Sequence, residues 1–462
     1  MKIRTGGHQI NMLQGPIWNQ IPRFAFPVAA TAILEQLFNA SDIAVVGNFT
    51  GAERTVSVAA VGANSSIISL IVNLFIGIAL GANVVIAHAI GRNNREEVQK
   101  TVHTSIVVAL LGGLLVAVAG ELAAAPVLRL LQVPEDVFPL ALLYLRIYLI
   151  GMPVILLYNF EAAIFRSVGE TKTPLLALAF SGVLNVVLNL FFVIVLHMTV
   201  NGVAIATVIS NGVSSVILYQ KLRHSQREIR VSARNLRIDA ASLKRIFRIG
   251  LPAGIQSAVF SVANIVIQSS INSLGTVVMA ASSAAYNIEI ITYDILNSFS
   301  QACTTFVGQN YGAGQIRRCR KTLLLCIVEG LITLGAAIAL ILFFGRTLLS
   351  IFNSDPDVVS VGYIRLMTIV TAHVFSLLYE VLSGYLRGFG ISLVPAVLTI
   401  IGVCGIRIMW IQFVFPHSRT FQTIMNVYPI SLSATAAMIF VAVMYYIHKN
   451  KRKGEARPGA DR

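Results

Sequence analysis

The segment "FPVAATAILEQLFNASDI" at residues 26–43 has a counterpart in "LPAGIQSAVFSVANIVIQ" at residues 251–268. The two align Pro27 with Pro252 and Asn39 with Asn264. Two more matches follow in the same order, at offsets of 221–225 residues. They pair "AHAIGRNNREEVQKT" at 87–101 with "VGQNYGAGQIRRCRKT" at 307–322, and "FRSVGETKTP" at 165–174 with "LRGFGISLVP" at 386–395. Three collinear matches predict that the second half of the chain repeats the first.

The composition places these repeats in a membrane. Of the 462 residues, 56% are hydrophobic and 12% are charged, whereas a soluble domain carries about 25% charged residues. Apolar stretches of roughly 20 residues recur along the chain, each long enough to span a bilayer. We expect an all-α integral membrane protein with twelve spans, at about 24–48, 58–90, 101–123, 137–166, 174–196, 200–222, 249–273, 278–310, 321–346, 358–387, 393–415 and 423–447.

The net charge of +15 indicates orientation in the membrane, and we expect no nucleic-acid partner. When residues at the span ends are counted with the adjoining loops, 28 of the 35 Lys and Arg residues fall on the side that holds both termini, and four fall on the other. Basic residues accumulate in cytoplasmic loops. We therefore predict a multi-pass protein of the cell membrane with both termini and the basic segment 223–248 in the cytoplasm.

Each half contains six spans, so both halves insert in the same orientation. We expect an N-terminal lobe at 1–222, a cytoplasmic linker at 223–248 and a C-terminal lobe at 249–462. Parallel repeats of this kind, related by an axis along the membrane normal, typically enclose a binding site near the midplane. The pattern favours an alternating-access transporter over a receptor or an anchored enzyme.

At these residues the chain resembles the multidrug and toxic compound extrusion (MATE) family of cation-coupled antiporters. The resemblance covers nearly the full length. It is carried by Pro27 and by "SDIAVVG" at 41–47, "RSVGETKTP" at 166–174, "LNVVLNLFFV" at 184–193, "NGVAIATVIS" at 201–210 and "VGQNYGAGQ" at 307–315. It implies two pseudo-symmetric six-helix bundles and export of drug-like, often cationic compounds in exchange for H⁺ or Na⁺.

A polar stripe runs along the first span, where Thr31, Glu35, Asn39 and Asp42 fall on one helical face. A carboxylate at mid-membrane costs roughly 2.5–3.5 kcal/mol on insertion scales, so it is expected only where it is used. Burial disfavours the charged form, which favours a bound proton or Na⁺ at Asp42. The alternative is a structural network in which Asp42 only fixes packing.

Amides and hydroxyls in the fifth and sixth spans are the expected partners of this stripe. They are spaced by four residues: Ser181, Asn185 and Asn189, then Thr207 and Asn211. Their oxygens suit a hard cation, but such residues also join helices in any membrane bundle. The MATE resemblance implies a cation site at Asp42, Asn185, Asn189 and Thr207. Many members have Asp where this chain has Asn189, so we expect Glu35 to supply the second carboxylate.

A substrate cavity is expected to combine amides, an aromatic ring and acids without fixed cationic partners, which suits a large organic cation. An interhelical network is the alternative. The candidates are Asn39, Gln256, Asn264, Gln268, Glu289, Tyr293 and Asp294. Another MATE branch has a Glu in the seventh span at the position of Phe260, so a cation site of that kind is not expected here.

Pro27 and Pro252 are expected to kink their helices, because proline removes a backbone hydrogen bond. Protonation of nearby Asp42 would then bias two kink states. The chain has no phosphate-binding loop and no hydrolase motif. We therefore expect no enzyme activity, no cofactor and no metal other than Na⁺ at Asp42. We also expect a monomer.

One alternative transporter function is a flippase for lipid-linked oligosaccharides, a member of the same superfamily. Its anionic pyrophosphate substrate would require several basic residues inside the spans, and only Arg146, Arg365 and Arg407 lie there. A membrane-embedded enzyme or receptor explains neither the repeat nor the acidic stripe.

Overall fold

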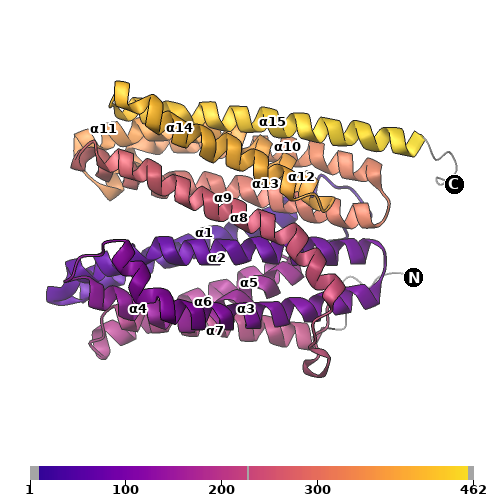
Figure 1. Cartoon of the computed structure of the whole chain (residues 1–462), viewed down its shortest axis with the longest axis horizontal. Helices are drawn as coiled ribbons and strands as arrows, with labels where there is room; N and C mark the ends of the chain where they lie inside the picture. The colour runs from indigo at the N-terminus through magenta and orange to yellow at the C-terminus, as the bar shows by residue number, and fades with distance from the viewer. Residues whose placement is uncertain (1–9, 226–227, 456–462) are drawn as a thin grey trace. The chain divides into compact units, whose positions relative to one another are not determined.

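The computed structural model describes residues 10–225 and 228–455. Residues 1–9 of the predicted N-terminal lobe, 226–227 of the predicted linker and 456–462 of the predicted C-terminal lobe lie outside the described residues. Within the described part, every regular element is a helix, as Figure 1 shows. The predicted all-α fold is thus confirmed.

The first seven long helices follow the predicted spans closely. They are α1 (Gln20–Phe49), α2 (Arg54–Gly91), α3 (Arg95–Leu130), α4 (Phe138–Ile150), α5 (Met152–Ser167), α6 (Lys172–Leu190) with its π-helical extension η2 (Phe191–Val195), and α7 (Val200–Arg223). Helices α4 and α5 meet at an angle of 50° and together form one broken span. The break falls at Gly151, where a side chain would collide with Val208 of α7 at 2.3 Å.

The remaining helices complete the set. They are α8 (Ala240–Asn272), α9 (Thr276–Gly312), α10 (Ile316–Phe352), α11 (Pro356–Arg365) continuing through η4 (Leu366–Val370) into α12 (Thr371–Gly388), α13 (Leu393–Thr399) continuing through η5 (Ile400–Gly405) into α14 (Ile406–Phe413), and α15 (Phe421–Glu455). Short 3₁₀ turns lie at η1 (Gly51–Glu53), η3 (Ala233–Asn235) and η6 (Phe415–His417).

Twelve helical spans result when continuous or broken helices are taken together. In the described residues, nine helices are apolar and long enough to cross a membrane, and the α4–α5 pair is a tenth. Helices α1 and α9, which carry the acids of the predicted site, bring the number to the predicted twelve. Helix α1 continues through Pro27, and α8 through Pro252.

The chain divides into two compact units, and α1 and α8 each pass from one unit to the other well inside the helix. Among the described residues, unit 1 comprises 10–15, 26–225, 228–258 and 312–314, and unit 2 comprises the rest. Helix α1 therefore begins in unit 2 and enters unit 1 at Phe26, whereas α8 leaves unit 1 after Ala258.

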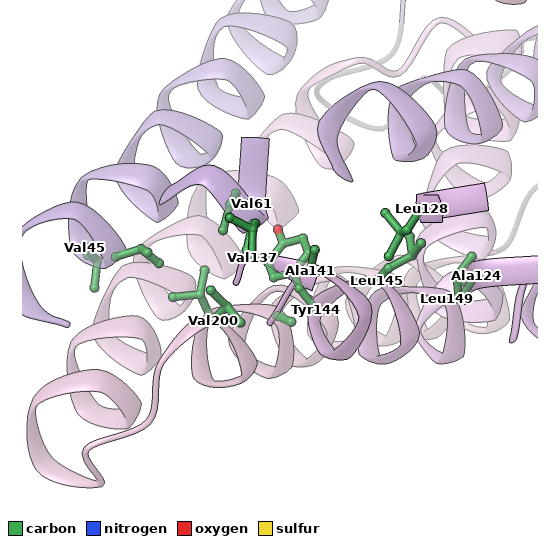
Figure 2. Packing of buried hydrophobic residues seen from close by; sticks show 14 of the residues in the cluster. Val45, Val61, Ala124, Leu128, Val137, Ala141, Tyr144, Leu145, Leu149 and Val200 are labelled. Carbon is green, nitrogen blue, oxygen red and sulfur yellow. The ribbon is translucent and has the colours of Figure 1, made fainter. Parts of the chain in front are cut away.

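Apolar packing holds the helices of unit 1 together. One cluster joins α1, α2, α3, α4 and α7, and Figure 2 shows Val61 and Val137 beside Ala141 and Tyr144. A second cluster packs Ile78, Ala79 and Ala82 of α2 against Ile246 and Ile249 at the start of α8. The first cluster fixes α1 and α7 beside the polar residues described below.

Glycines bring the start of α8 very close to α2 within unit 1. A Cβ on Gly77 would lie 2.2 Å from the backbone nitrogen of Gly254, and one on Gly81 would lie 2.7 Å from that of Gly250. Each helix carries its two glycines four residues apart, so both present a flat face to the other. This small-residue spacing is one that membrane helices use for close contact.

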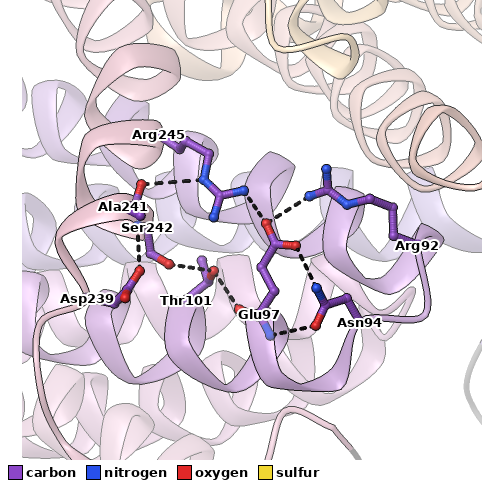
Figure 3. A network of polar contacts seen from close by, with 8 residues as sticks. All are labelled: Arg92, Asn94, Glu97, Thr101, Asp239, Ala241, Ser242 and Arg245. Carbon is purple, nitrogen blue, oxygen red and sulfur yellow. Dashed lines mark hydrogen bonds and ion pairs between the residues drawn. The ribbon is translucent and has the colours of Figure 1, made fainter.

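The linker lies along the first turns of α3. Asn94 caps α3 by accepting a bond from the Glu97 backbone, and the Glu97 carboxylate binds Arg92 and Arg245 (Figure 3). Asp239 accepts a 2.8 Å bond from the Ser242 backbone at the start of α8. This bond lowers the pKa of Asp239 below its usual value. The linker is thus attached to unit 1 by charged and capping contacts.

Candidate cation site

A small cavity lies inside unit 1, among α1, α2, α4, α5, α6 and α7. Its volume is about 150 Å³, below the roughly 300–1,000 Å³ of drug-sized ligand sites. An ion with a few waters fits this space better than an organic molecule does. The polar side chains that line it are Glu35, Asn39, Asp42, Tyr148, Tyr158, Asn159, Ser181, Asn185, Thr207, Ser210 and Asn211.

Asp42 is the buried acid in this cavity whose two oxygens both accept hydrogen bonds. It is 5% exposed, and neither of its oxygens is paired with a basic residue in the described chain. Asn189 donates to Oδ1 at 2.6 Å, and the Thr207 hydroxyl donates to Oδ2 at 3.0 Å. The carboxylate is therefore held by neutral donors alone, which leaves its charge uncompensated.

Asn185 links these two donors. Its amide donates to the Thr207 hydroxyl at 3.3 Å, and its Oδ1 accepts a 3.2 Å bond from Asn189. The structure thus brings together Asp42, Asn185, Asn189 and Thr207 from α1, α6 and α7. The four-residue spacing on α6 explains why both asparagines reach the same carboxylate.

One oxygen beside Asp42 has no partner. Asn189 Oδ1 is buried and accepts no hydrogen bond in the described residues. A buried carbonyl oxygen without a donor carries a desolvation cost.

Glu35 and Asn39 line the same cavity from α1. Glu35 is half-buried and interacts electrostatically with Arg166 at the end of α5. The two acids of the cavity therefore differ, because Asp42 lacks a basic neighbour of this kind. Among the described residues, no group of three or more His, Cys, Asp or Glu side chains has a geometry suitable for a metal.

The other predicted substrate residues do not line this cavity. Gln256 is buried in the part of α8 that belongs to unit 1. The remaining five belong to unit 2, where Gln268 donates to Asn272 at 2.8 Å and the Tyr293 ring lies 6.4 Å from that of His373. These five are Asn264, Gln268, Glu289, Tyr293 and Asp294.

The expectation that these acids lack fixed cationic partners is wrong for Glu289. Arg365 donates to both of its carboxylate oxygens, from Nη2 at 2.5 Å and from Nε at 2.9 Å. A bidentate pair of this geometry neutralises the acid. Sequence reasoning missed this pair because 76 residues separate its members. The only available signal was a basic residue inside a span.

Comparison with known proteins decides the family. The MatE family model matches residues 27–191 and again 252–411, once in each half. The chain belongs to the MATE family. The probable multidrug resistance protein YoeA of Bacillus subtilis is 26% identical over 444 residues, which cover 95% of each chain. The probable multidrug resistance protein NorM of Thermotoga maritima is 25% identical over 401 residues, covering 85% of this chain and 84% of the relative.

Solved structures of MATE proteins share the fold. An outward-facing multidrug resistance MATE family transporter superposes with a TM-score of 0.88 at 23% identity, covering 96% of this chain and 98% of that one. A MATE crystal structure in complex with MaL6 gives a TM-score of 0.89 at 23% identity, with coverages of 97% and 100%. This MATE chain is thus a multi-pass membrane transporter of the multidrug efflux type.

Proposed function

We propose that this MATE protein is a secondary antiporter of the plasma membrane that exports drug-like, often cationic compounds by alternating access. An inward flow of H⁺ or Na⁺ drives export, and Asp42 is the coupling site. It needs no cofactor, has no enzyme activity and works as a monomer. The observation that carries the proposal is a buried carboxylate held only by neutral donors, in a cavity of about 150 Å³.

The chemistry around Asp42 suits a cation that comes and goes. A carboxylate with a fixed Arg or Lys partner has little need of a proton or Na⁺, whereas one held by amides and a hydroxyl does. The Asn185 side chain, whose amide binds Thr207, adds a further neutral polar group to the same cavity. Glu35 supplies a second acid to the same cavity, two turns away on α1.

The flippase alternative receives less support. Two of the three span arginines that could hold a pyrophosphate are already paired, Arg365 with Glu289 and Arg146 with Glu121. Arg407 alone lacks an acidic partner among the described residues. A single buried cation is a poor match for two phosphates.

The test is ethidium transport in proteoliposomes under an imposed gradient. Wild-type protein is expected to move ethidium against its gradient when H⁺ or Na⁺ flows the other way. Asp42→Asn keeps the shape of the site but removes the ionisable group, and it should abolish gradient-driven transport. Unchanged transport by Asp42→Asn would refute the coupling assignment.

The control is Glu53→Gln, because Glu53 is an exposed acid just after α1, outside the cavity. Its transport should match the wild type. Imposing the pH gradient and the sodium gradient separately then identifies the coupling ion. Equal loss of transport in both variants would indicate a general effect of removing acids and not a site.

A further inference from the structure

Among the described residues of unit 2, three arginines are buried, and they differ in how their charge is balanced. Arg365 binds Glu289 through two bonds, and Arg387 lies 3.6 Å from Glu380. Arg407 in α14 is 2% exposed and pairs with no carboxylate in the described residues. It is therefore the buried cation in this part of the chain that still lacks a counter-charge.

The contacts of Arg407 hold its side chain in place without neutralising it. Its Nε donates to the Ser431 hydroxyl at 3.1 Å. Its guanidinium lies 4.3 Å from the centre of the Tyr428 ring and 5.6 Å from that of Phe260. Aromatic faces attract a cation and orient it, but they accept none of its conventional hydrogen bonds.

The free end of the guanidinium retains its donor capacity, although the side chain as a whole is buried. Its terminal nitrogens, Nη1 and Nη2, have no acceptor among the described residues. Neither of them is fully sealed from solvent, unlike Nε of Arg387. A guanidinium presents its donors as a planar fork that matches a carboxylate or phosphate. Burying it with no anion is costly.

We propose that Arg407, Tyr428 and Phe260 form a subsite for the anionic group of an aromatic organic molecule. The guanidinium binds the carboxylate or phosphate, and the two rings contact the adjoining aromatic part. The protein would then accept aromatic anions and zwitterions in addition to simple cations. This inference depends on the proposed export function in one respect, because it treats the bound molecule as a transported substrate.

The first test measures binding by calorimetry, with the full-length protein in phosphatidylcholine nanodiscs. The probes are 2-naphthoate and its neutral counterpart 2-naphthamide. Wild-type protein should bind naphthoate about tenfold more tightly than naphthamide. Arg407→Gln should remove that preference and change naphthamide binding by less than about twofold. Equal binding of the two probes to wild-type protein, or a preference that survives in Arg407→Gln, would overturn the proposal.

A matched control comes from Arg346→Gln. Arg346 also lies over an aromatic ring, 5.2 Å from the centre of Tyr363, but it is exposed. This variant should bind both probes as the wild type does. An equal loss of naphthoate binding in both variants would show a general charge effect and would also overturn the proposal.

The second test separates binding from folding. If Arg407 has no counter-charge before a ligand binds, Arg407→Met should melt at the wild-type temperature or above it. Naphthoate should raise the melting temperature of wild-type protein but not of the variant, because a ligand stabilises only the state that it binds. An unliganded variant that melts several degrees lower would assign Arg407 a structural role instead.

The third test distinguishes organic from inorganic anions. The naphthoate titration is repeated with sodium chloride, sodium phosphate or sodium gluconate as the background salt. Naphthoate should retain its preference over naphthamide in each salt. Loss of that preference in chloride or phosphate alone would assign the site to inorganic anions. No ion gradient is used and Asp42 is unchanged, so failure of the coupling proposal would leave these results standing.

Discussion

The Thr207 hydroxyl shows how a single residue can respond to the state of its neighbour. It has one proton but lies 3.0 Å from two acceptors, Oδ2 of Asp42 and the carbonyl of Val203. When Asp42 is charged, the hydroxyl gains most by donating to it. When Asp42 carries a proton, the hydroxyl can accept a hydrogen bond from the carboxylic acid and donate its own to the carbonyl of Val203 instead.

We predict that Thr207→Val weakens ion coupling. Valine has the same shape but lacks the donor, and a hydrogen bond to a charged group is worth about 1.5–3 kcal/mol. The ion concentration for half-maximal transport should change by about tenfold or more. Ser210→Ala is the control, since it removes a cavity hydroxyl that has no hydrogen-bond partner. Equal effects of the two variants would contradict the specific role of Thr207.

The residues around Asp42 could be predicted because each lies on a regular four-residue spacing within one helix. The spacing fixes which side chains share a face, and the amides and hydroxyls on facing helices then meet. The contacts of Arg365 and Arg407 could not be predicted from such a spacing. Their partners lie on other helices, and helix packing, which the sequence pattern does not reveal, decides whether an arginine meets Glu289 or the ring of Tyr428.

At the scale of the helix, the contact between α2 and the start of α8 depends on the absence of side chains. We predict that Gly77→Ala destabilises the protein by more than about 1 kcal/mol, because its Cβ would collide with the backbone of Gly254. Gly62→Ala in the same helix meets no atom within 4 Å. It should be neutral or stabilise by up to about 1 kcal/mol. Melting temperatures in detergent measure both, and similar values would argue against tight packing.

The ion pairs of Glu97 with Arg92 and Arg245 are expected to hold the linker against α3. Glu97→Gln removes the charge that Arg92 and Arg245 share, so the segment between α7 and α8 should be cut faster by trypsin. Glu96→Gln is the control, because the ion pair of Glu96 is formed with half-buried Lys100 on the same helix and not with an arginine of α8. Such surface pairs contribute little. If both variants resist trypsin as the wild type does, capping and hydrogen bonds alone hold the linker.

The helix boundaries themselves were largely predictable, since apolar length is a strong signal. The continuity of α13 through η5 into α14 was predicted as one span at 393–415, but its π-helical middle was not. A π turn depends on which carbonyls find partners in the folded bundle. The division of α1 and α8 between the two units likewise depends on tertiary contacts.

At the scale of the whole molecule, the predicted orientation can be tested with added cysteines. All four native cysteines are buried and free, so a new exposed one should dominate labelling. Arg234→Cys in the linker should react with a membrane-impermeant maleimide only from the cytoplasmic side. Arg419→Cys, just before α15, should react only from outside. Labelling of both from the same side would contradict the predicted topology.

The crossing of α1 and α8 between units bears on how such a chain could arise from a gene of half its length. The first helix of each repeat begins in one unit and continues in the other. A polypeptide with a single repeat would have no second unit to receive the start of its first helix. Two copies could exchange the N-terminal parts of their first helices, so that each part packs in the other copy, as in a domain-swapped dimer. Gene fusion would then make a reciprocal exchange between subunits a permanent feature of one polypeptide.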